Sequence, residues 1–220
     1  MNTHIKSLVA TLLLTLPISA QAVKLKPADT REGYIARLLL NETPFPGERG
    51  WVSEKDTQTA MLQILWVLES RRTHIPQGYK QQQLAATKSN DIIDLITVGG
   101  EKGQCDGFYK DANGNFKAVP RVEERLNYLL NIANKGTPGR FARLFTFANG
   151  ISEAYVAGGM PGVDKFAKLN NIGPIPVTGR AYSWMTDKDI YAPGGSFIKI
   201  PDKQSGSLGG NRFFTLKKKD

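Results

Sequence analysis

The sequence has few of the residues that build cross-linked or metal-based sites. Its single cysteine, Cys105, excludes an internal disulfide, so packing must stabilise the fold. Two histidines, His4 and His74, are too few for the usual zinc site, and no twelve-residue calcium loop is present. There is no Gly-x-Ser-x-Gly serine elbow, and neither Gly99-Gly100 nor Gly209-Gly210 lies in a phosphate-binding motif. We therefore expect no metal and no cofactor.

Long apolar runs are also scarce, apart from one at the N-terminus. Lys6 is a positive residue before the short apolar stretch Leu8 to Leu16, and Ala20-Gln21-Ala22 is a small-residue cleavage site. The stretch is too short to span a bilayer well, and no later segment is long enough. We expect residues 1–22 to be a secretory signal peptide. The protein from Val23 onward is then exported, periplasmic or secreted, without stable membrane insertion.

The remaining residues, 23–220, suit a single domain with a sizeable core and contain no repeat or low-complexity tract. The formal charge is +9, and it becomes +8 when Lys6 leaves with the signal peptide. A basic exported protein is attracted to anionic surfaces such as the bacterial wall, lipid headgroups or nucleic acid. The aromatic residues do not alternate with basic ones as in a nucleic-acid stacking platform. We therefore expect no nucleic-acid partner. We also expect the protein to be a monomer.

Helix signals dominate the first 150 residues. Asp29 and Glu32 are typical of a capping box for a helix over about 30–41. Ser53 and Asp56 predict the start of a second, central helix, and a third is expected to start near Pro120. A fourth helix follows a break at Gly136 to Gly139. The expected inward stripes are Ala60, Met61, Ile64, Leu65 and Leu68 in the second helix; Val122, Leu126, Leu129, Leu130 and Ala133 in the third; and Phe141, Leu144, Phe145 and Ala148 in the fourth.

The rest of the chain is less regular. Residues 91–98 form an apolar run that fits either a short helix or a strand. From Gly158 onward Gly and Pro are frequent, and the best strand candidates are Phe197 to Ile200 and Arg212 to Leu216. Helices followed by a loop-rich part with a little sheet predict an α+β domain.

Glu42 is the strongest candidate for chemistry. It shares one helical stripe with Ile35, Leu38 and Leu39, and Pro44 then stops the helix. A carboxylate that faces a core is poorly solvated, and desolvation raises its pKa toward the range of a general acid. The alternative is that Glu42 lies slightly off the stripe and is solvated at the helix end.

Several stretches resemble the SleB-type cell wall hydrolases. Residues 35–42, 45–48 and 60–71 are similar to that family's helix ending in a catalytic Glu, its short loop and its second helix ending in Val-Leu-x-x-Arg. Residues 103–108, with Gln104, are similar to its Gln-containing cleft segment. Residues 210–214 resemble its final Gly-Asn-His-x-Phe strand. The resemblance covers about 30–150 and the last dozen residues. The chain departs from the pattern at Arg212, in place of His, and at Cys105, in place of an aromatic residue.

The resemblance implies a lysozyme-like fold and cleavage of the β-1,4 bond between N-acetylmuramic acid and N-acetylglucosamine in peptidoglycan. Glu42 would be the general acid/base. The implied substrate contacts are Gln104, Tyr109, Glu48 and Asn211. Gln104 can form a hydrogen bond with an N-acetyl group, and Tyr109 or Trp184 can stack on a sugar ring.

Two routes stay open at this stage. Hydrolysis with two protein carboxylates needs a partner for Glu42, and Glu48, Glu101 and Asp106 are the nominees. Without a partner, a lytic transglycosylase route is simpler, in which Glu42 acts first as acid and then as base while an anhydro ring forms. Two other functions also stay open: a peptidoglycan amidase or peptidase using Cys105 and His74, and a non-catalytic cell-wall-binding protein.

Overall fold

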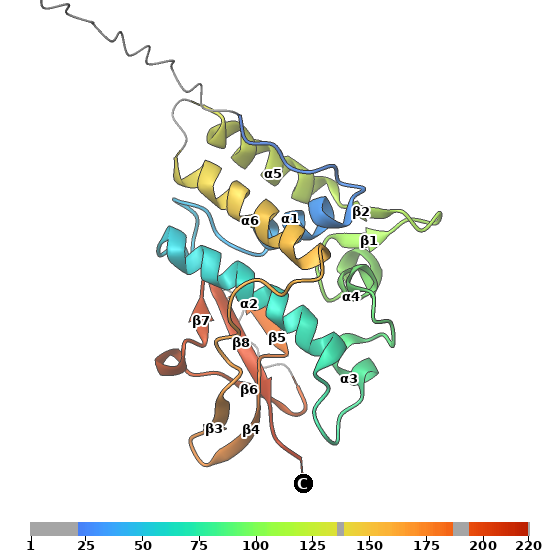
Figure 1. Cartoon of the computed structure of the whole chain (residues 1–220), viewed down its shortest axis with the longest axis vertical. Coiled ribbons are helices and arrows are strands. Elements are labelled where there is room, and N and C mark those ends of the chain that lie inside the picture. Colours follow the sequence, from blue (N-terminus) through green and yellow to red (C-terminus); the bar gives the residue numbers. More distant parts are fainter. Residues whose placement is uncertain (1–21, 136–138, 187–193, 220) are drawn as a thin grey trace, which may run out of the picture.

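Helix α2 (Glu54–Thr73) crosses the middle of the molecule, with helices on one side and a small sheet on the other (Figure 1). The computed structural model describes residues 22–135, 139–186 and 194–219. The side chain of Ser53 caps α2 by accepting a hydrogen bond from the backbone N–H of Asp56. The whole predicted stripe of α2 is buried. The prediction of a central, buried second helix is therefore confirmed.

The helical side consists of α1 (Arg31–Asn41), α5 (Pro120–Ala133) and α6 (Arg140–Val156). Helix α1 packs against α6, α5 and α2, and every residue from 33 to 40 is buried. The predicted stripes of α5 and α6 face the core, apart from Leu130 and Phe141, which are only partly buried. Phe45 packs against Phe145 at a ring-centroid distance of 5.4 Å, which joins the loop after α1 to α6.

The sheet side is built around β8 (Asn211–Leu216), all six residues of which are buried. Strand β5 (Ser183–Thr186) pairs with it along one edge, and β6 (Phe197–Lys199) and β7 (Ser207–Leu208) pair along the other, all antiparallel. Two separate hairpins are β1 (Phe108–Lys110) with β2 (Phe116–Ala118), and β3 (Leu169–Ile172) with β4 (Ile175–Gly179). The molecule is thus a mixed α+β fold with small antiparallel sheets.

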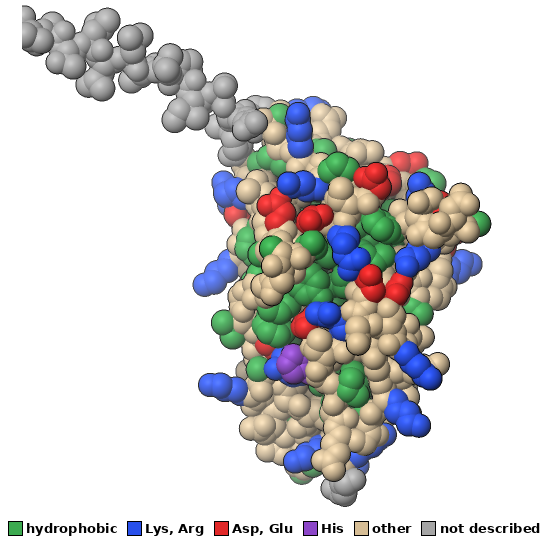
Figure 2. Space-filling view, turned by 45° about the vertical axis from the view of Figure 1, so that its right-hand side comes forward, with side chains coloured by type: hydrophobic (Ala, Val, Ile, Leu, Met, Phe, Trp, Pro, Cys, Tyr) green, Lys and Arg blue, Asp and Glu red, His purple; other side chains and the backbone are tan. Residues whose placement is uncertain are grey.

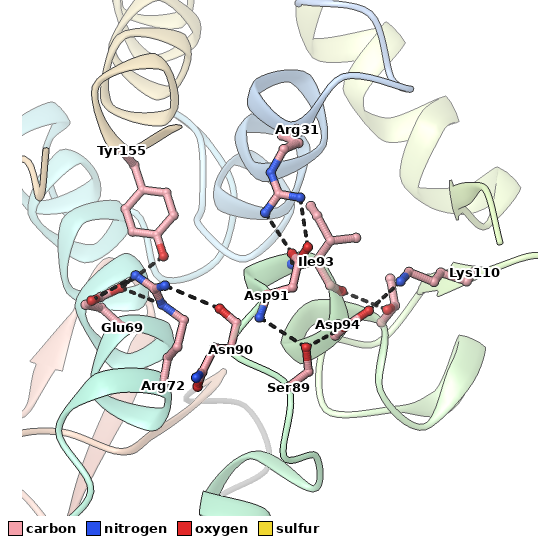
Figure 3. A network of polar contacts seen from close by, with 11 residues as sticks. Arg31, Glu69, Arg72, Ser89, Asn90, Asp91, Ile93, Asp94, Lys110 and Tyr155 are labelled. Carbon is pink, nitrogen blue, oxygen red and sulfur yellow. Dashed lines mark hydrogen bonds and ion pairs between the residues drawn. The ribbon is translucent and has the colours of Figure 1, made fainter. Parts of the chain in front are cut away.

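Polar side chains near the N-terminal end of α1 link α1 to the start of α4 and α2 to α6 (Figure 3). Arg31 binds both carboxylate oxygens of Asp91, at 2.7 and 3.0 Å, just before α4 (Ile92–Thr97). On α2, Glu69 accepts bonds from Arg72 and from the hydroxyl of Tyr155 on α6. Burial alone would raise the pKa of Glu69, but these bonds hold it below its usual value. Exposed ion pairs contribute little to stability, so the buried Glu69 is the energetically important member.

Several details differ from the sequence predictions. Thr30, and not Asp29, caps α1, because its side chain accepts the bond from the N–H of Gly33. The ambiguous run 91–98 is the helix α4, capped by Asp91. The predicted strands at Phe197 and Arg212 are confirmed as β6 and β8. The hairpins and β5 were not predicted, since strands of three to five residues leave little alternation to read.

Some predictions fall on residues outside the described ranges. Nearly all of the expected signal peptide (1–22) lies there, as do residues 136–138 of the expected break before α6. The short remaining elements are α3 (Gln81–Ala85) and two 3-10 turns, η1 (Gly100–Lys102) and η2 (Asp202–Gln204). Within residues 22–135, 139–186 and 194–219, no helix is both long and apolar enough to cross a bilayer.

We predict that Phe145→Ala destabilises the fold by about 3–5 kcal/mol, because it leaves a cavity between α6 and the Phe45 loop. The measurement is the denaturant midpoint at constant slope. Tyr128→Ala on α5 is the control, since its side chain is 66% exposed and should change stability by about 0.5 kcal/mol or less. Equal losses for the two variants would contradict this account of the core.

Candidate active site

Glu42 is the residue that ends α1. Its backbone N–H still bonds to the carbonyl of Leu38 at 2.9 Å, and its own φ and ψ of −80° and −4° remain near helical values. Thr43 then bonds back to the carbonyl of Leu39 at 2.8 Å, and Pro44 prevents another turn. The carboxylate therefore stands at the negative end of the α1 dipole, which disfavours its ionised form.

Two hollows of about 450 and 440 Å³ meet at Glu42. Asn41, Glu42 and Thr186 belong to both, so the hollows continue each other on either side of the carboxyl group. The other residues of the first are Thr43, Pro44, Glu48, Arg49, Gly50, Arg125, Gly209 and Gly210. The other residues of the second are Gly103, Gln104, Asp106, Arg121, Trp184 and Met185. An extended ligand laid across both would pass over Glu42.

The Glu42 carboxyl group is partly buried, and each of its two oxygens accepts one hydrogen bond. The indole N–H of Trp184, on β5, donates to Glu42 Oε2 at 2.9 Å, and the amide of Asn41 lies 3.4 Å from Oε1. Burial raises the pKa of Glu42 above its usual value, and the two hydrogen bonds only partly oppose this. Asp106 acts in the raising direction and Arg125 in the lowering one. The structure thus favours a poorly solvated acid over a solvated carboxylate at a helix end.

Asn211 fixes the backbone of Glu42. Its side-chain amide donates to the carbonyl oxygen of Glu42 at 2.6 Å and to that of Gly209 at 3.0 Å. Asn211 is fully buried at the start of β8. This place suits a residue that positions Glu42, whereas the sequence prediction made Asn211 a substrate contact. Its neighbour Arg212 is buried too, and it bonds to the carbonyl of Ile200 and to Asp202.

Each hollow contains one further carboxylate, and each of these is paired with an arginine. Glu48 bonds to Arg125 at 2.6 Å in the first hollow and also accepts the backbone N–H of Phe45 at 2.7 Å. Asp106 bonds to Arg121 at 2.6 Å in the second hollow. Glu101, the third nominee for a second acid, is exposed on η1, outside the lining of both hollows.

Gln104 lies in the second hollow, as the sequence predicted for a substrate contact. Its Oε1 accepts a hydrogen bond of 2.6 Å from Arg71 on α2. Its amide N–H₂ group is consequently the part of the side chain that remains to donate to a ligand.

Tyr109 and Trp184 differ in position from what the sequence led us to expect. Tyr109 lies on β1, where its carbonyl accepts a bond from Tyr34, and it is not among the described residues that line the two hollows. Trp184 lines the second hollow but is only 8% exposed, and the guanidinium of Arg71 lies 5.3 Å from its ring centroid. Its position supports Glu42 more than it offers a stacking surface.

Cys105 and His74 have different surroundings. Cys105 is buried in the main core, and burial raises the pKa of its thiol far above the usual value. His74 caps the C-terminal end of α2, is exposed, and bonds to Thr73 through Nδ1. A buried thiol that resists ionisation is a poor nucleophile, so this geometry does not favour thiol chemistry.

The sequence did not single out Asn41, Arg125 or the anchoring role of Arg71. Arg125 donates to the carbonyls of Leu40 and Thr43 as well as to Glu48, and so clamps the loop that follows Glu42. A basic residue on α5 carries no local signal for such a contact, because 77 residues separate it from Glu48. Among the residues that the structure describes, no group of three or more His, Cys, Asp or Glu is placed to hold a metal ion.

Comparisons of the chain with models of protein families, with curated proteins and with solved structures gave no match. The function must therefore be argued from the site itself.

We predict that Glu42→Gln is more stable than the wild type at neutral pH, with a difference that vanishes in acid. A carboxyl group with a raised pKa in the folded state binds more protons there than in the unfolded state. The contribution of this carboxyl group to wild-type stability is therefore fully present below its pKa in the unfolded state, near 4.5. That contribution is lost as the pH rises through its pKa in the folded state. Denaturant midpoints at pH 4 and pH 8 measure the difference.

The exposed Glu124→Gln on α5 is the matched control for replacing a Glu with Gln away from the two hollows. A Glu42→Gln difference that stayed constant between the two pH values would show that Glu42 titrates like an ordinary solvated carboxyl group.

Proposed function

We propose that this protein cleaves peptidoglycan glycan strands between N-acetylmuramic acid and N-acetylglucosamine, with Glu42 as general acid/base. The observation that carries the proposal is a carboxyl group with a raised pKa at the point where two hollows meet. A sugar is a poor leaving group unless its bridging oxygen is protonated, and a carboxylic acid kept neutral can supply that proton. We further propose that the fold is of lysozyme-like type.

The shape of the site supports a polymeric substrate. The two hollows are of similar volume and share Glu42, so sugar units can lie on both sides of the bond that is cut. The amide N–H₂ of Gln104 in the second hollow is suited to the carbonyl oxygen of an N-acetyl group. A donor for the N-acetyl carbonyl favours an N-acetylated glycan over a glucan, which has no such group.

The charges favour the lytic transglycosylase route. The two carboxylates that share the hollows with Glu42 are each bound to an arginine, whereas Glu42 has no ion-pair partner among the described residues. Glu42 donates its proton to the bridging oxygen as the glycosidic bond breaks. The C6 hydroxyl of the muramic acid then bonds to its own C1 and gives its proton to the Glu42 carboxylate. The product is a 1,6-anhydro ring, and Glu42 is again protonated.

The surface charge suits a wall substrate. The formal charge is +9, and basic side chains are spread around the face shown in Figure 2 instead of gathering in one patch. Such a surface gives general attraction to an anionic wall. We propose that the protein acts there after export. A protein that only binds the wall would use the same hollows, and product analysis separates the two functions.

Replacing Glu42 with Gln should abolish cleavage of purified sacculi, because the variant keeps the shape and the Trp184 contact but has no proton to donate. We expect at least a 100-fold loss in the rate of release of soluble fragments, consistent with removal of a general acid. Binding to sacculi should persist in a pull-down. Glu124→Gln is the matched control and should clear sacculi like the wild type. Wild-type cleavage by Glu42→Gln would reject the role of Glu42.

The products decide between the two routes. We predict anhydro-muropeptides in mass spectra of the wild-type digest, and a loss of less than about tenfold in rate for Asp106→Asn. Asp106 is the nominee that shares the second hollow with Glu42. Reducing ends together with an inactive Asp106→Asn would instead show hydrolysis with Asp106 as the second carboxylate. Free peptides would show an amidase.

A further inference from the structure

Arg71 is a buried arginine that has no carboxylate partner among the described residues. It lies near the C-terminal end of α2 and is only 6% exposed. Its contacts are the carbonyl of Tyr182, which accepts from Nε at 2.7 Å, the Oε1 of Gln104, which accepts from Nη1 at 2.6 Å, and the ring of Trp184. Burial lowers the pKa of Arg71 to about 10, so it remains a cation at neutral pH.

Burying a cation without an opposite charge is costly, and such groups are retained where they serve a site. The other buried arginine on the helical side, Arg37, shows the contrast. Arg37 is 9% exposed and also bonds to two backbone carbonyls, of Lys26 and Gly33, but it has a carboxylate partner in Glu123 at 3.2 Å. Packing alone therefore does not explain why Arg71 is buried and, among the residues described, lacks the carboxylate partner that Arg37 has.

The contacts of Arg71 lead to Glu42 on one side. Its guanidinium lies 5.3 Å from the ring centroid of Trp184, and the indole N–H of Trp184 donates to Glu42 at 2.9 Å. A cation over an indole ring restrains the ring and strengthens its N–H as a donor. The bond from Arg71 to the Tyr182 carbonyl fixes the backbone two residues before Trp184.

On its other side Arg71 sets the orientation of Gln104. A charged donor on Oε1 makes a strong hydrogen bond and determines which end of the amide faces the second hollow. With Oε1 bonded to Arg71, the N–H₂ group is the part of the side chain that can donate to a ligand. One buried cation thus organises both a hydrogen bond to the acid and a donor in the cleft.

We infer that Arg71 is a positioning residue, which aligns Glu42 through Trp184 and presents the Gln104 amide as a donor to the substrate. The inference rests on the proposed function, because it assigns Arg71 a part in the same reaction. It separates two effects: the Trp184 contact serves the chemical step, and the Gln104 contact serves substrate binding.

The test is steady-state kinetics on a soluble N-acetylated glycan fragment. Arg71→Met should lower kcat and raise KM together, with a loss in kcat/KM of about 100-fold, the scale on which small misplacements act. Arg71→Lys keeps the charge but not the planar fork, and we expect it to recover part of the loss. Trp184→Phe should mainly lower kcat, and Gln104→Ala should mainly raise KM.

A double-mutant cycle shows whether Arg71 acts through these two residues. In a variant that already carries Trp184→Phe and Gln104→Ala, adding Arg71→Met should lower kcat/KM by less than about threefold more. Arg37→Met is the control, and it should lose stability while kcat and KM stay at wild-type values. Wild-type kinetics for Arg71→Met, or a full additional loss in the double background, would overturn the inference.

The two proposals fail in different ways. Wild-type cleavage by Glu42→Gln rejects the proposed role of Glu42, and a wild-type protein that releases no soluble glycan fragments rejects the proposed function. Cleavage that depends on Glu42 but is indifferent to Arg71 rejects only the role of Arg71.

Discussion

The contact between the end of α1 and the sheet is the constraint on which the site depends. Asn211 on β8 bonds to the backbone of Glu42 at 2.6 Å, and Trp184 on β5 bonds to its side chain at 2.9 Å. Because β5 and β8 pair with each other, these two bonds come from one rigid surface. A carboxyl group held in this way keeps its position relative to both hollows, which a side chain at a free helix end would not do.

Close packing around α2 makes that contact possible. A Cβ on Gly209 would lie 2.5 Å from the Cβ of Ala60, so only glycine lets the turn before β8 approach the helix so closely. Gly209 also has a φ of +51°, which side chains seldom adopt. The turn therefore sets the depth at which Asn211 enters the core. Arg125 holds the other side by bonding to the carbonyls of Leu40 and Thr43.

The sequence was a good guide to the helices and to the poor solvation of Glu42, because both depend on local spacing. The stripe of α2, the strand at Arg212 and the mixed α+β class could all be read from periodicity and composition. The partners of Glu42 could not, since Trp184 and Asn211 lie 142 and 169 residues away along the chain. The choice between Asp29 and Thr30 as the cap of α1 was also beyond spacing, because Asp and Thr are both favoured at the N-cap and the two residues are adjacent. Asn211 was chosen from a motif as a substrate contact, but its burial and its bond to the Glu42 carbonyl could not be read from that motif.

The site combines two groups that each oppose folding. Glu42 is an acid in a poorly solvated place at the negative end of a helix, and Arg71 is a buried cation that no carboxylate pairs with in the described part of the chain. Trp184 lies between them, with the guanidinium at its face and the carboxyl group at its edge. If the two groups were in direct contact, the arginine would hold the carboxyl group ionised and remove the acid. The ring separates them, so that burial can still raise the pKa of Glu42 while the guanidinium binds to Trp184 and Gln104.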